Sequence, residues 1–195
     1  MQHYLEFMLF AFSAMVSPGP NNLMLMHSGL NFGIKRTLPQ FLGSTIGLIF
    51  MMVLIAAGLG IIFERVPNIK IVIKVLGTLY MLFLACKISQ MNENKTNAQI
   101  TAPLTVLKAF GFQMVNPKLW VICITFFGVF QMNTHFWLNS LFLITSIVII
   151  TIPSAFIWMS FGKVIEKIIK TSRHRKILNL TLAFSLAATV VLLWI

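Results

Sequence analysis

The chain has 195 residues, of which 58% are hydrophobic and 10% charged, with a mean hydropathy of +0.89. Soluble domains are about 45–50% apolar and about 25% charged, so this composition excludes an ordinary water-soluble fold. The formal net charge of +11 comes from 15 Lys and Arg against four carboxylates. These cations lie at the ends of apolar runs, as in a membrane protein, which argues against a nucleic-acid binder.

The first half of the chain holds three apolar segments long enough to cross a membrane. A spanning helix needs about 20 apolar residues, with a range of roughly 17–25, and residues 4–26, 39–63 and 69–89 meet that length. In the third segment, Lys74 and Lys87 bracket only twelve uncharged residues. We therefore expect both lysines to extend along the helix toward opposite membrane interfaces.

A polar segment, residues 90–106, separates this first half, residues 1–89, from a second half, residues 107–195. The second half is predicted to contain three further helices, at residues 107–130, 136–161 and 177–195. An odd number of spans makes the second half enter the membrane inverted, as in many secondary transporters. The sequence therefore predicts an all-α membrane protein, one domain of six transmembrane helices arranged as two inverted three-helix repeats.

The loops between these helices predict the orientation in the membrane. Only Arg65, Lys70 and Lys74 lie on the side that carries the loops after the second and fourth helices. The other side carries eleven cations, which are Lys35, Arg36, Lys87, Lys95, Lys108, Lys163, Lys167, Lys170, Arg173, Arg175 and Lys176. By the positive-inside rule this basic side is cytoplasmic, so we expect both termini outside. The same cations suit contact with anionic membrane lipids.

The run Ser17-Pro18-Gly19-Pro20-Asn21-Asn22 interrupts the first apolar segment. Proline removes a backbone donor and clashes with a carbonyl one turn back, so a helix breaks here. At membrane depth such a break is tolerated only where the freed backbone groups meet other protein or a water-filled cavity. The two asparagine side chains add amides that both donate and accept hydrogen bonds.

The second half repeats this device in the fourth helix. Met114-Val115-Asn116-Pro117 aligns with Met15-Val16-Ser17-Pro18 at a constant offset, and Lys118 follows. An interrupted helix at a corresponding place in each half is the best sequence indicator of a transporter binding site. We therefore predict that the first and fourth helices are both broken and that the two breaks flank a site.

These residues resemble the LysE/RhtB family of amino-acid exporters. The resemblance spans nearly the whole chain and rests on Ser17 to Asn22, Gly29, Gly33, Gly43, Gly47, Gly77, Tyr80 and Asn116-Pro117-Lys118. The Pro-Gly-Pro-Asn-Asn variant is most similar to the branch with cysteine and O-acetylserine exporters. The resemblance implies export of a small neutral amino acid or derivative across the bacterial inner membrane, driven by protons. The family's Pro-Gln-Phe at the end of the fourth helix is replaced by Gly128-Val129-Phe130-Gln131.

An amino-acid substrate requires partners for its carboxylate and its ammonium, which freed N–H groups and carbonyls at a break provide. The candidate substrate-binding or gating residues are Ser17, Pro18, Gly19, Pro20, Asn21, Asn22, Asn116, Pro117 and Lys118. Lys118 either pairs with the substrate carboxylate or extends to the cytoplasmic interface. Gly43 and Gly47, at GxxxG spacing, predict a close helix crossing. For the coupling proton, Glu6 and His27 are both candidates.

Two other functions are compatible with parts of the sequence. Cys86 and Cys123, one in each half, allow an intramembrane thiol electron-transfer protein, although neither has a pKa-lowering neighbour in sequence. A non-transporting membrane scaffold fits the helices and basic loops but leaves the paired breaks unexplained. The pattern predicts no enzyme motif, metal site or cofactor, and a homodimer is compatible with so small a transporter.

Overall fold

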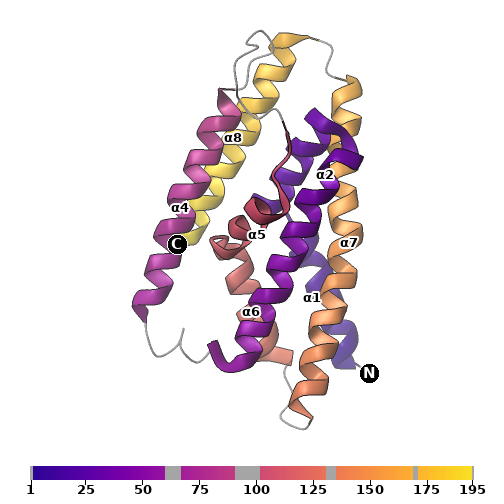
Figure 1. Ribbon diagram of the computed structural model, residues 1–195, viewed down its shortest axis with the longest axis vertical. Coiled ribbons are helices and arrows are strands. Elements are labelled where there is room, and N and C mark those ends of the chain that lie inside the picture. Colours follow the sequence, from indigo (N-terminus) through magenta and orange to yellow (C-terminus); the bar gives the residue numbers. More distant parts are fainter. Residues whose placement is uncertain (1, 60–66, 91–101, 131–134, 169–170, 195) are drawn as a thin grey trace.

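The computed structural model describes residues 2–59, 67–90, 102–130, 135–168 and 171–194, and these are all helical or in short connections (Figure 1). This confirms the predicted all-α class. The elements in chain order are α1 (Gln2–Val16), α2 (Pro20–Leu54), the π-helical turn η1 (Ile55–Leu59), α4 (Pro67–Ser89), α5 (Val106–Met114), α6 (Pro117–Phe130), α7 (Phe136–Ile168) and α8 (Ser172–Trp194).

Both predicted breaks are present. The first apolar segment leaves helical geometry between α1 and α2, and the fourth does so between α5 and α6, where the chain bends by 66°. The predicted helices at residues 69–89, 136–161 and 177–195 correspond to α4, α7 and α8, and α7 continues to Ile168. Most of the predicted connecting segment, residues 91–101, lies outside the described residues.

The structure differs from the prediction at the connection between the first two helices. Residues 27–38 were expected to include a loop, yet α2 is helical on both sides of a sharp turn at Gly33, which has φ 74°. The Ser28 hydroxyl donates to Gln40 Oε1 over 2.6 Å, although twelve residues of straight helix span roughly 18 Å. Glycine tolerates positive φ, so one residue reverses the helix and no long loop is needed.

Close glycine contacts bring the helices of the bundle together. A Cβ at Gly29 would overlap the backbone of Met159, and one at Gly162 would overlap the Met26 carbonyl, so the first arm of α2 crosses α7 at backbone distance. A Cβ at Gly43 would likewise overlap the Val106 carbonyl in α5. The predicted close crossing at Gly43 is therefore confirmed, and small residues are what allow such crossings in a membrane.

Two large apolar clusters, besides a small one around Leu25 and Met159, fill the interior of the described part of the chain. One joins α1, the second arm of α2, α6 and α7 around Phe7, whose ring meets Phe126 edge-on at 5.6 Å. The other joins the first arm of α2 with α4, α5 and α8 around Met81 and Leu186. In Figure 1, α4 and α8 lie side by side at one flank of the bundle. The two breaks lie between these clusters, where α1, α2, α6 and α7 approach one another.

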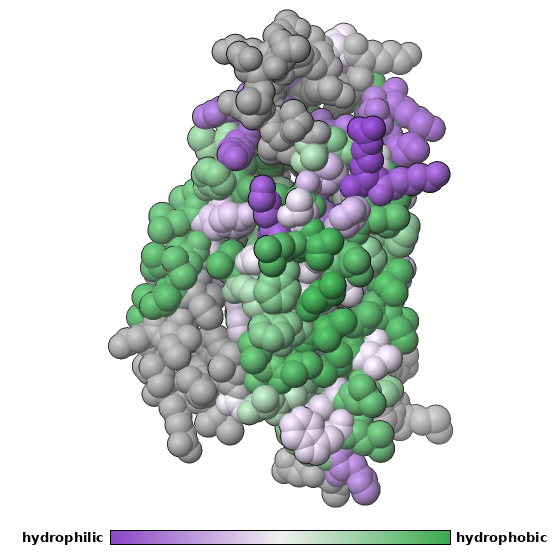
Figure 2. All heavy atoms as spheres, in the orientation of Figure 1, coloured by the Kyte–Doolittle hydropathy of each residue, from purple (hydrophilic) through white to green (hydrophobic). Residues whose placement is uncertain are grey.

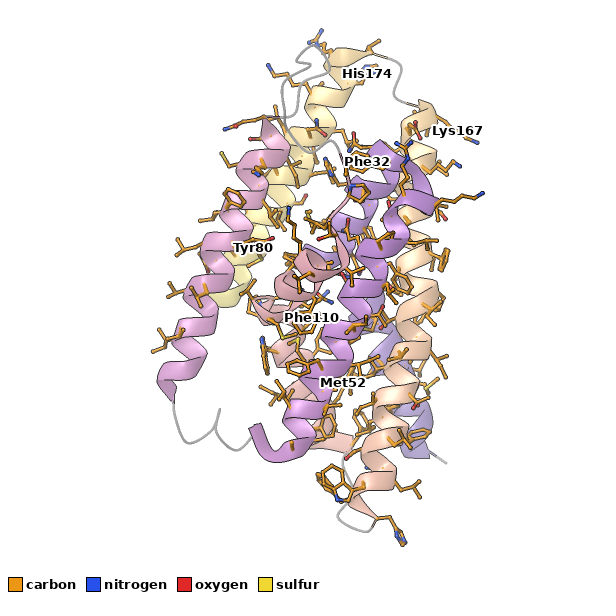
Figure 3. All side chains as sticks on the ribbon, viewed as in Figure 1. Phe32, Met52, Tyr80, Phe110, Lys167 and His174 are labelled. Atoms are coloured by element: carbon orange, nitrogen blue, oxygen red, sulfur yellow. The ribbon has the colours of Figure 1, made fainter. Side chains whose placement is uncertain are left out.

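On the face shown in Figure 2, the surface is apolar across the middle, and most of its hydrophilic side chains gather at one end. Figure 2 shows the apolar residues as a broad band, and large side chains such as Leu79, Leu141 and Phe184 are 60%, 61% and 75% exposed. So extensive an exposed apolar surface is typical of contact with lipid. Phe32, beside the Gly33 turn, lies toward the same end as Lys167 and His174 (Figure 3).

By length and composition, the described residues include two helices able to cross a membrane, Pro20–Gly58 and Phe136–Ile168. The bent pair formed by α5 and α6 adds a third span, and shorter apolar helices occur at Glu6–Val16, Val75–Ser89 and Lys176–Ala188. The chain is thus a multi-pass membrane protein. The count of six spans and the inverted relation of the two halves stay predictions.

Candidate functional site

Side chains from α2 and α7 satisfy the carbonyl groups that the first break frees at the end of α1. Asn22 Nδ2 donates to the Met15 carbonyl at 2.7 Å and to the Ser17 carbonyl at 3.0 Å. Ser154 Oγ donates to the same Met15 carbonyl at 2.8 Å, and Trp158 Nε1 donates to the carbonyl of the last α1 residue at 3.0 Å. Helix ends need such partners away from water. These hydrogen bonds therefore stabilise the break between α1 and α2.

Lys118 connects the second break to the first. Its ammonium donates to Ser17 Oγ at 2.7 Å and to the carbonyls of Ser17 and Pro18, each at 3.0 Å. A cation at the C-terminal end of a helix is favoured by the helix dipole. In this arrangement the three protons of the Lys118 ammonium bind oxygens in the opposite half of the chain.

The Lys118 side chain also explains why residue 19 is glycine. Gly19 is extended, with φ −178° and ψ 172°, a conformation open to any residue. A Cβ at Gly19, however, would lie 2.7 Å from Lys118 Cδ and 2.8 Å from Lys118 Nζ. In the alignment of the two breaks, Gly19 and Lys118 occupy equivalent positions. The absent side chain in one half leaves room for the long side chain of the other.

The second break is capped mainly from its own half. Trp120 Nε1 donates to the Met114 carbonyl at 2.7 Å, and the Asn116 backbone N–H donates to the Gln113 carbonyl at 3.0 Å. The Gln113 amide then reaches the Ser44 carbonyl in α2 at 3.1 Å. The second break is therefore tied to α2, the same helix that begins at the first break.

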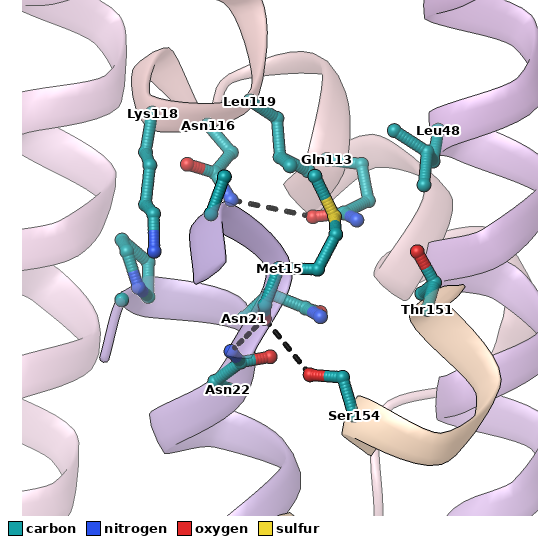
Figure 4. Close-up of a pocket in the computed structure, with 13 residues that line it drawn as sticks. Met15, Asn21, Asn22, Leu48, Gln113, Asn116, Lys118, Leu119, Thr151 and Ser154 are labelled. Atoms are coloured by element: carbon teal, nitrogen blue, oxygen red, sulfur yellow. Dashed lines mark hydrogen bonds between the residues drawn. The ribbon is translucent and has the colours of Figure 1, made fainter. Parts of the chain in front are cut away.

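A cavity of about 30 Å³ lies where the two breaks meet (Figure 4). We call it the central cavity. Three buried oxygens around it, Asn21 Oδ1, Asn116 Oδ1 and Thr151 Oγ1, have no hydrogen-bond partner in the described part of the chain. A water molecule needs at least about 10–15 Å³ measured in this way, so the cavity has room for one or two waters. Buried acceptors without a partner are uncommon in folded proteins.

The structure brings the predicted site residues together. The central cavity is lined by Gly19, Pro20, Asn21, Asn22, Asn116 and Lys118. Ser17 and Pro18 provide the oxygens that Lys118 binds. Pro117 begins α6 and packs against Gly77 of α4.

The sequence pattern did not indicate four further residues of the site, Gln113, Thr151, Ser154 and Trp158. Isolated hydroxyl groups in the apolar run of α7 were the available signal. Two other candidates lie elsewhere: Glu6 is exposed on α1, and His27 is buried further along α2. Neither lines the central cavity.

Comparison with known protein families identifies the family of this chain. The profile of the family described as "LysE type translocator" matches residues 12–195. The chain belongs to the LysE family. The recognition made from the paired breaks is thereby confirmed, and the match includes both breaks and every residue around the central cavity.

Relatives of this LysE family chain are efflux proteins. It is 29% identical over 174 residues to a leucine efflux protein of Enterobacter sp. (strain 638), which covers 84% of this chain and 81% of the relative. It is 27% identical over 124 residues to a cysteine/O-acetylserine efflux protein of Klebsiella pneumoniae, covering 64% of this chain and 63% of the relative. No solved structure matches. LysE family members are transporters and not enzymes.

Proposed function

We propose that this chain exports a small neutral amino acid or derivative across the bacterial inner membrane. The substrate class follows the relatives, whose names specify leucine or cysteine and O-acetylserine. The observation that carries the proposal is the central cavity, where the breaks of both halves converge around three unpartnered oxygens. Paired helix breaks near the middle of a membrane are where transporters of this kind bind their substrates.

The groups around the central cavity match the two ends of an amino acid. An α-ammonium group has three protons to donate, and Asn21 Oδ1, Asn116 Oδ1 and Thr151 Oγ1 are three acceptors without donors. For the carboxylate, the start of α2 is available, and the Lys118 ammonium becomes available once it releases Ser17 and Pro18. The N-cap of α2, Gly19, provides no side-chain hydrogen bond, so the positive end of this helix is open to an anion.

The size of the central cavity requires movement during transport. About 30 Å³ accommodates water but no amino acid, so the substrate enters only when the two breaks separate. In the closed arrangement Lys118 holds the breaks together through Ser17 and Pro18. A substrate carboxylate that attracts Lys118 weakens this connection, so binding favours the open arrangement. We therefore expect the cavity to open alternately to the two sides of the membrane as the two halves move relative to each other.

Proton coupling and membrane orientation belong to the same proposal. The exposed cations Lys35, Arg36, Lys163 and Lys167 flank the Gly33 turn and the end of α7, and Figure 2 shows polar side chains gathered at that end of the molecule. This distribution supports a cytoplasmic location for that end and external termini. Reporter fusions to the termini test the orientation, and collapse of the proton gradient should stop export. Size measurement of the solubilised protein tests for a homodimer.

The proposal is tested by efflux from cells loaded with labelled leucine, cysteine or O-acetylserine. Wild-type protein should export at least one of these, and Asn116→Leu should abolish that export at equal membrane abundance. Thr181→Val, on the exposed face of α8, is the matched control and should export normally. The double variant Cys86→Ser, Cys123→Ser should also export normally. Export that requires these cysteines would instead favour thiol chemistry, and no export across the panel would favour the scaffold.

A further inference from the structure

A second cavity of about 510 Å³ lies between α2, α4 and the segment that leads into α5. We call it the outer cavity. Small-molecule sites in proteins typically enclose about 300–1,000 Å³, so the outer cavity has room for an amino acid, unlike the central cavity. Phe32 is one of its lining residues, so part of the cavity lies toward the basic end of the bundle (Figure 3).

The outer cavity combines a buried polar floor with a basic rim. Its floor includes His27, Ser28 and Gln40, which are 2%, 3% and 1% exposed. The Ser28 hydroxyl donates to Gln40 Oε1 at 2.6 Å, which leaves the Gln40 amide nitrogen as the group that can donate to a ligand. Such buried polar side chains are costly in an apolar bundle unless they meet polar partners.

The rim carries two exposed cations, Lys87 on α4 and Lys108 on α5. The Lys87 ammonium lies 4.8 Å from the centre of the Phe83 ring, which also lines the cavity. None of the described residues that line the outer cavity is a carboxylate. A recess lined by cations without neighbouring carboxylates attracts anions. A carboxylate is the anionic group that every amino acid carries.

The two cavities lie in series along α2. Met24 lines the outer cavity and Asn21 lines the central one, and three residues of helix rise by about 4.5 Å. The Tyr80 ring of α4, which lines the outer cavity, packs against Phe112 of α5 with centroids 5.6 Å apart. Gln113, next to Phe112 in the chain, lines the central cavity. This aromatic pair therefore connects the linings of the two cavities.

We propose that the outer cavity is the loading site, where Lys87 and Lys108 bind the carboxylate of the exported amino acid before it passes the Tyr80–Phe112 pair. The inference rests on the proposed export function and adds a first binding step on the cytoplasmic side. It assigns recognition of the carboxylate to two lysines outside the paired breaks. Lys118 then receives the same carboxylate at the central cavity.

Initial rates of uptake into inside-out membrane vesicles test this step, because uptake there corresponds to export. Uncharged replacements, Lys87→Gln with Lys108→Gln, should raise KM at least about tenfold, since hydrogen bonds to charged groups are among the stronger polar contacts. They should leave kcat within about twofold. Lys87→Arg with Lys108→Arg should restore a low KM. Lys163→Gln with Lys167→Gln, exposed on α7, is the charge-matched control and should leave KM unchanged.

Two comparisons identify the recognised group. The amide of the transported amino acid lacks a carboxylate, so its KM should be high in wild type and unaffected by the lysine replacements. If the lysines instead bind the headgroup of an anionic lipid, their effect on KM will disappear when the protein is reconstituted in vesicles of zwitterionic phosphatidylcholine, which has no net charge, and this would overturn the inference. Wild-type transport with unchanged KM in the Lys87→Gln, Lys108→Gln variant would overturn the loading site alone. Absence of wild-type transport would overturn the export function as well.

Discussion

The capping of α1 predicts a specific failure of additivity between Asn22 and Ser154. Both side chains donate to the Met15 carbonyl, at 2.7 and 2.8 Å, and Met15 is 6% exposed. The single variant Ser154→Ala leaves the Asn22 bond in place. The single variant Asn22→Leu leaves the Ser154 bond, and the Ser17 carbonyl keeps its Lys118 donor. Only the double variant leaves the Met15 carbonyl without any donor.

The expected magnitudes follow from the number of bonds lost. Ser154→Ala removes one hydrogen bond and should lower the free energy of unfolding by about 0.5–1.5 kcal/mol. Asn22→Leu removes two and should lower it by about 1–3 kcal/mol. An orphaned carbonyl away from water costs a further amount of about 1–3 kcal/mol. The double variant should therefore be less stable than the sum of the single effects by at least about 1 kcal/mol.

Unfolding in mixed detergent micelles, followed by circular dichroism as the denaturing detergent is increased, measures these free energies. The control cycle pairs Asn22→Leu with Thr181→Ala, whose hydroxyl bonds within α8. Those two effects should add within about 0.5 kcal/mol. If the effects of Asn22→Leu and Ser154→Ala also add within about 0.5 kcal/mol, these side chains do not share an acceptor, and the proposed capping of α1 is wrong.

Three further predictions concern the site and the packing that supports it. Asn116→Leu should leave the melting temperature unchanged or raise it. The Asn116 amide oxygen is buried without a partner and its nitrogen makes only a 3.4 Å hydrogen bond, so little is lost when both are removed. A clear fall in the melting temperature would contradict this. Lys118→Met should abolish export but lower the free energy of unfolding by less than about 3 kcal/mol, since the Ser17 carbonyl keeps its Asn22 donor; export at the wild-type rate would refute the role of Lys118. Gly43→Ala should lower the free energy of unfolding by about 1–3 kcal/mol, because the added Cβ overlaps α5. Gly111→Ala, in a helix with open space around the added Cβ, should raise it by up to about 1 kcal/mol. Similar effects at both glycines would argue against the close crossing.

The breaks were readable from the sequence because their cause is local. Pro18 and Pro117 lack a backbone donor and crowd the preceding turn, which favours a break, although α2 and α7 accommodate Pro39 and Pro153 in their interiors. The long apolar runs likewise fixed the helical class, and Gly43 with Gly47 indicated a close crossing that the structure contains. In each case the physical cause lies within a short stretch of the chain.

What the sequence did not indicate depends on contacts between distant segments. Ser154 caps Met15 across 139 residues, and Lys118 reaches Ser17 across 101. No local pattern distinguishes Ser154 from the other hydroxyl groups of α7. The turn at Gly33 was also missed, because a glycine with positive φ replaces the loop that helix reversal usually needs. The outer cavity arises only once α2, α4 and α5 pack together.

The central claim is that the paired breaks around Asn116 bind and move an amino acid. Counterflow by the purified protein in proteoliposomes tests it most directly. Vesicles loaded with unlabelled leucine, cysteine or O-acetylserine are diluted into a trace of the labelled compound. A carrier should accumulate label transiently above equilibrium for at least one of them, and Asn116→Leu should show no accumulation. No accumulation by the wild type, or equal accumulation by both proteins, would contradict the account.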